Sequence, residues 1–143
     1  MVVPNWTMGG KNIYDHEDFT TDVIGFVYCI TYSNNQKYIG SKVIRSLVRV
    51  KPTKKQLAVR KNFVRKEWKN KPFVNYVGSH KETEGLIISK REILEVCSDK
   101  INLTYSELKH MVMNNVLTDD NYLNANCLGK FYKGKITSEV IYK

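Results

Sequence analysis

The chain of 143 residues is 42% hydrophobic and 26% charged, which is the composition of one ordinary globular domain. Its 23 Lys and Arg residues outnumber its 14 Asp and Glu residues, and the formal net charge of +9 predicts a polyanionic partner, with nucleic acid before an anionic membrane surface. The three cysteines are too few and too scattered for a disulfide framework. No run approaches the roughly 20 apolar residues of a membrane span, and the N-terminus lacks a signal-peptide pattern, so a cytoplasmic location and no membrane partner are expected.

The first predicted feature along the chain is an acidic N-terminal extension, residues 1–23, which holds four acidic residues and one lysine. The stretch "VIGFVYCITY" at 23–32 is rich in β-branched and aromatic residues and predicts a strand. "SNNQ" at 33–36 contains two asparagines, which tolerate the positive φ of a tight turn, and "KYIGSK" at 37–42 predicts a returning strand. Together these runs predict a β-hairpin.

A strongly basic insertion follows at 42–71, where twelve basic residues oppose one acidic residue. Because so few acids leave the positive charges without ion pairs, the insertion is expected to lie along nucleic-acid phosphates rather than to be only a solvated loop. Its second part, "KKQLAVRKNFVRKEWKN" at 54–70, places Leu57, Val64 and Trp68 on one helical face. Trp68 is therefore expected to be a core or edge aromatic rather than a platform for stacking bases. The candidate DNA-binding residues are Arg45, Lys54, Lys55, Arg60, Lys61, Arg65 and Lys66.

Beyond the insertion, "ISKREILEVC" at 88–97 predicts a third strand, and "NLTYSELKHMVMNNVL" at 102–117 predicts a helix. Thr104 suits the N-cap of that helix, with Glu107 three residues later, which is the arrangement of a capping box. No linker or internal repeat divides the chain. The order of hairpin, insertion, strand and helix predicts a single small α/β (α+β) domain over residues 1–143.

Several of these stretches together resemble the GIY-YIG nuclease superfamily. "GFVY" is followed, ten residues after its tyrosine, by "YIG", and "SKREILEVC", "LTYSELKHMVMNNVL" and "DDNYLNAN" come in the order expected for the phage-encoded, free-standing Seg-type homing endonucleases of that group. The resemblance covers about residues 24–132 and implies a nuclease core there, with the basic insertion inside it and a C-terminal tail at 133–143. It also implies a small mixed three-stranded sheet flanked by helices, and a bacterial or phage-infected host cell.

The resemblance implies catalytic roles for the residues that match the family motifs. Glu107 would be the ligand of one divalent metal, Mg²⁺ with Mn²⁺ as a substitute, which supplies Lewis acidity to phosphodiester hydrolysis. Tyr28 would accept a proton from water if nearby cations lowered its pKa, and Tyr38 would orient water or phosphate. Asn124 would match the asparagine near the end of the family pattern, and Gly40 would allow the backbone to approach the site closely. Glu107 as a mere capping-box partner and Asn124 as an ordinary turn residue remain open alternatives.

The sequence departs from the family pattern at the catalytic arginine. The family carries this residue about ten positions after the second tyrosine, where this chain has Val48. Arg49 is the first choice for the cation, and Lys42, directly after "YIGS", is the second. A guanidinium clamps phosphate oxygens bidentately, which an ammonium cannot do.

The sequence thus predicts a metal-dependent endonuclease that hydrolyses phosphodiester bonds in double-stranded DNA, of the homing type found in phages and mobile elements. Two-strand cleavage by a domain with one site needs a second copy or a second pass, so a homodimer would fit. The alternative is a catalytically weak or inactive nucleic-acid-binding protein on a nuclease scaffold, which the misplaced arginine favours. An RNA-binding structural protein is a third hypothesis, which explains the charge but not the ordered motifs.

Overall fold

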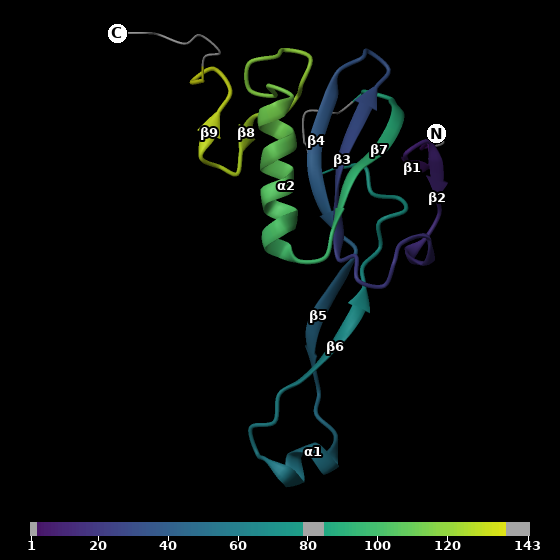
Figure 1. The fold of residues 1–143 in the computed structure, drawn as a ribbon, viewed down its shortest axis with the longest axis vertical. Helices are drawn as coiled ribbons and strands as arrows, with labels where there is room; N and C mark the ends of the chain where they lie inside the picture. Colours follow the sequence, from purple (N-terminus) through teal and green to yellow (C-terminus); the bar gives the residue numbers. More distant parts are fainter. Residues whose placement is uncertain (1–2, 79–84, 137–143) are drawn as a thin grey trace.

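The computed structural model describes residues 3–78 and 85–136. A five-stranded mixed sheet lies at the centre of this part of the chain (Figure 1). β1 runs parallel to β7, and the other neighbouring pairs are antiparallel. The mixed α/β class is confirmed, whereas residues 137–143 of the predicted tail lie outside the described residues. In their order across the sheet, the strands are β2 (Lys11–Ile13), β1 (Trp6–Met8), β7 (Ile88–Cys97), β3 (Gly25–Tyr32) and β4 (Lys37–Val43).

The sheet has five strands instead of the predicted three, because the predicted acidic extension supplies β1 and β2. Trp6 on β1 is fully buried, and its indole Nε1 donates a hydrogen bond to the carbonyl oxygen of Phe73 at 3.0 Å. Its ring also packs edge-on against Phe26 and Tyr28, with centroids 5.0 and 5.5 Å apart. Burying an indole with its N–H satisfied stabilises a fold by about 3 kcal/mol. This long-range packing holds β1 beside β7.

Two apolar layers cover the two faces of the sheet. The layer under helix α2 (Lys100–Met113) includes Val27 and Ile39 of the hairpin. The opposite layer includes Trp6 and Tyr28, so consecutive residues of β3 serve opposite faces, as the alternation of a strand requires. Three short elements complete the fold: the 3-10 helix η1 (His16–Asp18) and the paired strands β8 (Asn126–Cys127) and β9 (Phe131–Tyr132).

Helix α2 begins and ends earlier than the sequence predicted. Its N-cap is Asp99, whose carboxylate accepts a hydrogen bond from the backbone N–H of Asn102 at 2.7 Å, so the prediction of Thr104 as the N-cap is wrong. Just past its end, Asn115 adopts the left-handed conformation (φ 54°) common after helix C-termini. Glu107 therefore lies in the helix interior and forms no capping box.

The basic insertion forms an arm, residues 45–70, that projects from one end of the sheet (Figure 1). Its strands β5 and β6 pair as an antiparallel ribbon. The helix predicted across 54–70 is wrong beyond its first turns, because Arg60 is already extended and the chain then enters β6. Trp68, which was expected to be a core or edge aromatic, is 62% exposed on β6. The elements of the arm are β5 (Arg45–Val50), α1 (Lys54–Val59) and β6 (Arg65–Asn70).

Candidate functional site

The β3–β4 hairpin has the form that the sequence predicted, with Asn35 at φ 67° in its turn. Tyr28 stands directly opposite Gly40 in the register. Because side chains alternate along a strand, Tyr38, Gly40 and Lys42 point to the same side of the sheet as Tyr28. The two motif phenols are accordingly brought together, with ring centroids 6.4 Å apart.

Tyr28 is enclosed on all sides and only 1% exposed. Its hydroxyl donates a hydrogen bond to the hydroxyl of Tyr76 at 3.4 Å, and a Cβ on Gly40 would lie 2.5 Å from its oxygen. Burial, then the neighbouring Tyr76, Tyr38 and Glu107, raise the pKa of Tyr28 far above its usual value near 10. The phenol therefore keeps its proton and donates, whereas the expected role as a proton acceptor needs a cation to reverse this shift.

Glu107 approaches the same strand from the opposite face of the sheet. Its Oε2 accepts a hydrogen bond from the hydroxyl of Ser41 on β4 at 2.8 Å. Burial raises the pKa of Glu107, and the Ser41 hydrogen bond opposes that rise. Since Ser41 directly follows Gly40, the carboxylate and the Tyr28 phenol meet at one point of β4, where no side chain stands between the strands.

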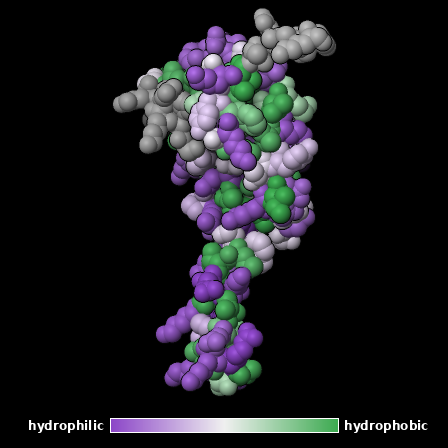
Figure 2. Space-filling view, turned by 90° about the vertical axis from the view of Figure 1, so that its left-hand side faces the viewer, coloured by the Kyte–Doolittle hydropathy of each residue, from purple (hydrophilic) through white to green (hydrophobic). Residues whose placement is uncertain are grey.

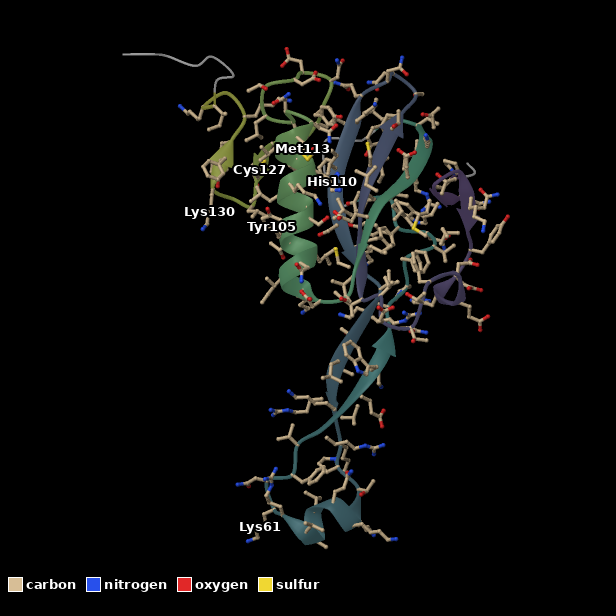
Figure 3. All side chains as sticks on the ribbon, in the orientation of Figure 1. Lys61, Tyr105, His110, Met113, Cys127 and Lys130 are labelled. Atoms are coloured by element: carbon tan, nitrogen blue, oxygen red, sulfur yellow. The ribbon has the colours of Figure 1, made fainter. Side chains whose placement is uncertain are left out.

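The rotation of α2 that aims Glu107 at β4 is fixed by Glu95 of β7. Ser106 donates a hydrogen bond to the Glu95 carboxylate, and Lys109 Nζ and His110 Nε2 lie 3.0 and 3.1 Å from it (Figure 3). The hydrogen bond from Ser106, followed by those from Lys109 and His110, lowers the pKa of Glu95 to about 2. Three consecutive contacts on one side of the helix leave Glu107 little freedom to turn away.

Lys42 is the cation that the structure brings to the phenols. Its Nζ lies 4.6 Å from the ring centroid of Tyr76, the hydrogen-bond partner of Tyr28. Both side chains line a hollow of about 570 Å³ whose other walls include His16 and Phe73. A hollow with an ammonium group on its wall suits an anionic group such as a phosphodiester.

Arg49, the first choice for the catalytic cation, is not brought to this site. It lies on β5 opposite Lys66, in the arm and away from the phenols (Figure 1). Two other arginines are held by backbone carbonyls: Arg45 donates to Thr20, Val23 and His16, and the buried Arg91 donates to Pro4, Val74 and Tyr76. The order of preference between Arg49 and Lys42 is therefore reversed.

Asn124 is 1% exposed and bound to the backbone of β4. Its Oδ1 accepts a hydrogen bond from the Ile39 N–H at 3.1 Å, and its Nδ2 donates to the Ile39 carbonyl at 2.7 Å. One bond to Lys37 from each side, from the Leu123 N–H and to the Asn121 carbonyl, extends this pairing along the edge of the sheet. The amide thus holds the strand that carries Tyr38 and Gly40.

The predicted DNA-binding residues divide into two groups. Arg45 lies at the base of the arm, where its guanidinium is bound to backbone carbonyls. The others lie farther along the arm, with Lys61 near its tip (Figure 3). Arg65 also forms an ion pair with Glu67. The remaining members of this second group are Lys54, Lys55, Arg60 and Lys66.

The donor set at Glu107 fits a single hydrated Mg²⁺ ion. In residues 3–78 and 85–136, no group of three or more His, Cys, Asp or Glu side chains comes together to hold a metal. Mg²⁺ dehydrates reluctantly and keeps several waters, so it needs only one or two carboxylates beside its substrate oxygens. Glu107 is such a carboxylate, half-buried, with one oxygen oriented by Ser41.

Two residues of the site were missed from the sequence. Ser41 could have been found from the alternation along β4, which turns it toward the helix that carries Glu107. Tyr76 gives no such signal, because it lies in a loop and meets Tyr28 across 48 positions of the chain. Only the folded chain shows it to be the link between Tyr28 and Lys42.

No helix among the described residues is long and apolar enough to span a membrane. Comparisons with curated proteins and with solved structures give no match. A family model described as "Putative endonuclease segE, GIY-YIG domain" matches residues 6–132, from β1 to β9, and so begins upstream of the resemblance noted over 24–132. This match covers most of the chain and supports endonuclease activity in general. The chain therefore belongs to the SegE-type family of GIY-YIG endonuclease domains.

Proposed function

We propose that this protein is a metal-dependent endonuclease that hydrolyses phosphodiester bonds in double-stranded DNA at strand β4. One observation carries the proposal: the half-buried Glu107 carboxylate is held by Ser41, next to the point where Gly40 admits the Tyr28 phenol. Membership of a nuclease family supports the reaction class. The geometry supports a site built on one strand from both faces of the sheet.

Each side chain of this site has a distinct task in the proposal. Glu107 would hold the Mg²⁺ ion, which when bound polarises the phosphate and lowers the pKa of a coordinated water. Lys42 attracts the phosphodiester into the hollow beside Tyr76. Tyr28 keeps its proton and fixes the hydroxyl of Tyr76 by a hydrogen bond, which sets the ring on which Lys42 lies. Tyr38 orients water or phosphate beside them.

The test is nicking of supercoiled plasmid by Glu107→Gln with Mg²⁺ or Mn²⁺. We expect the rate to fall about 100-fold or more, because several kcal/mol of charge stabilisation depend on the metal ligand. The amide of Gln still accepts the Ser41 hydrogen bond, so folding should persist. Glu92→Gln is the matched control, since Glu92 is a surface carboxylate paired with Lys90 at 3.0 Å. Nicking by Glu107→Gln at the wild-type rate, or nicking in EDTA, would contradict the proposal.

A second candidate function is a nucleic-acid-binding protein that is catalytically weak or inactive. The observation in its favour is that the described part of the chain places Lys42, and none of the arginines Arg45, Arg49 and Arg91, beside the phenols. An ammonium cannot bind two phosphate oxygens in the bidentate way of a guanidinium. Binding of the plasmid without nicking, across metals and salt concentrations, would favour this candidate.

The proposal extends to the biological setting that the Seg-type resemblance suggests. A homing-type enzyme would act in the cytoplasm of a bacterial or phage-infected cell. Cleavage of both strands at one site would need a homodimer or two successive nicks. Sedimentation of the protein with and without duplex DNA distinguishes these two routes.

A further inference from the structure

The two faces of the β5–β6 ribbon differ in exposure. Leu47 stands opposite Trp68, and Arg49 stands opposite Lys66, so these four side chains share one face of the ribbon. All four are exposed. On the other face, Val48 and its neighbours along both strands are half-buried for the most part, and the Arg65–Glu67 ion pair lies there.

The exposed face carries an apolar pair that the fold leaves uncovered. Trp68 is 62% and Leu47 is 47% exposed, whereas the chain's other tryptophan, Trp6, is fully buried. Figure 2 shows hydrophobic surface between hydrophilic side chains along the arm. Large exposed aromatics surrounded by polar groups are typical of binding surfaces. Leu47 and Trp68 are accordingly the residues of the arm that most need a partner.

The charge around this pair indicates a polyanion. Residues 45–70 contain ten basic residues and one acidic residue, Glu67, which Arg65 already neutralises. Arg49 and Lys66 flank the apolar pair on the same face. A two-stranded ribbon has the dimensions of a DNA groove, and several DNA-binding proteins use ribbons in that way. Phosphates then lie beside the ribbon, where basic side chains meet them, and base edges lie under its face.

We propose that the exposed face of the ribbon enters a groove of the DNA substrate, with Trp68 and Leu47 against the bases and Arg49 and Lys66 on the flanking phosphates. This inference rests on the DNA binding contained in the proposed function and assigns it a specific contact. Apolar side chains that enter a groove unstack a base step and bend the duplex. The arm thus contributes a contact with bases in addition to its phosphate contacts.

A purely structural role is the competing explanation for Trp68. A two-stranded ribbon is marginal alone, and a cross-strand Trp–Leu pair stabilises it by up to about 1 kcal/mol. Trp68→Leu separates the two roles, because leucine keeps an apolar contact with Leu47 but has no ring to stack on a base. A structural role predicts that Trp68→Leu binds DNA like the wild type.

The experiment measures tryptophan fluorescence in EDTA, in a Glu107→Ala background, so that no cleavage occurs. Trp6 is fully buried, so the difference between this protein and its Trp68→Phe variant isolates the emission of Trp68. We expect random-sequence duplex DNA to quench that emission, because stacking on bases quenches an indole. Heparin, a polyanion without bases, should bind the arm and leave the Trp68 emission unquenched.

Affinity for the duplex, titrated against salt, completes the test. Trp68→Leu should bind about tenfold more weakly or worse, with an unchanged salt slope, because base stacking does not release counterions. Lys66→Gln should reduce the slope by about one. Tyr105→Ala is the matched control, since Tyr105 is 66% exposed on α2, away from the arm (Figure 3).

Three results would overturn the inference while leaving the proposed function intact. The first is DNA binding without quenching of Trp68, and the second is equal quenching by heparin. The third is a Trp68→Leu variant with wild-type affinity, provided that circular dichroism shows both proteins folded. Quenching by anionic phosphatidylserine vesicles but not by DNA would instead assign the ribbon to a membrane surface. A wild-type protein that binds no duplex at all would refute the proposed function as well.

Discussion

Gly40 is the residue on which the geometry of the site depends most. A Cβ at this position would lie 2.5 Å from the oxygen and 2.7 Å from the Cζ atom of Tyr28. Tyr28 has no room to retreat, because its ring packs against Trp6, Phe26 and Tyr76. Its backbone conformation, in contrast, is ordinary strand, so the requirement for glycine is one of space.

We therefore predict that Gly40→Ala lowers the free energy of unfolding by about 1–3 kcal/mol and abolishes plasmid nicking, because it overpacks a closed site. Urea unfolding and the nicking assay measure the two effects. A double-mutant cycle provides the control: in a Tyr28→Phe background the contact with the hydroxyl is gone, so the cost of Gly40→Ala should be smaller. An equal cost in both backgrounds would show that another contact is responsible.

The residues that form the site were predictable from the motifs, but their neighbours were not. Tyr28, Tyr38 and Glu107 stand where the resemblance implies, and their catalytic roles remain predictions. Arg49 was chosen by its distance along the chain from Tyr38, which assumes that a helix follows β4. The chain instead enters the arm, and the side chain is carried away with it. Lys42 escapes this error because it still belongs to β4.

At the scale of elements, β4 is an edge strand whose position depends on a single side chain. Asn124 binds both the N–H and the carbonyl of Ile39, between Tyr38 and Gly40. Without its amide, two buried backbone groups would lose their partners. An asparagine near the end of the motif therefore supports the site from outside the sheet and need not touch substrate.

We predict that Asn124→Ala lowers the free energy of unfolding by about 2–4 kcal/mol, since each unsatisfied backbone group costs about 1–3 kcal/mol. Nicking should fall with it, because Tyr38 and Gly40 lose their fixed strand. Thermal unfolding and the nicking assay measure these effects. Asn121→Ala is the matched control, an exposed asparagine whose backbone carbonyl, and not its side chain, bonds Lys37. Lost nicking with unchanged stability would instead assign Asn124 a direct role in catalysis.

Elements with local signals were predicted well from the sequence. The hairpin and the strand at 88–97 depend on alternation and turn chemistry within a short window, and both are present. The start of α2 was missed because Asp99 and Thr104 both suit an N-cap, and only the packed helix distinguishes them.

The errors at the arm and the N-terminus arise from pairing between distant segments. The stretch around Trp68 also alternates with a period of two, but a strand there needs a partner, and "RSLVRV" twenty residues earlier was not recognised as one. β1 likewise gains its place from a parallel partner, β7, more than eighty residues away. Local propensity is weak for three-residue strands, so burial of Trp6 determines the result.

At the scale of the whole molecule, the arm is mounted on the nuclease core by a defined joint. His16 Nε2 lies 3.0 Å from the Ile44 carbonyl and 2.9 Å from the Lys71 carbonyl, the residues just before and after the arm. Carbonyls only accept, so this nitrogen carries the hydrogen. Arg45 adds three hydrogen bonds to carbonyls of residues 16–23, and the Lys71 N–H bonds the Ile44 carbonyl at 2.7 Å. Such a joint fixes where DNA held by the arm meets Glu107.

This arrangement makes Arg45 a test of how the arm and core cooperate. We predict that Arg45→Gln lowers nicking by about tenfold to 100-fold, because loss of the joint misplaces the bound DNA relative to the metal ligand. DNA affinity titrated against salt should keep the wild-type slope, because the guanidinium already binds carbonyls of the core. Lys66→Gln, on the exposed face of the ribbon, should instead reduce the slope by about one. A reduced slope for Arg45→Gln would return Arg45 to the phosphate contacts that the sequence predicted, and the joint would then depend on His16 and the backbone alone.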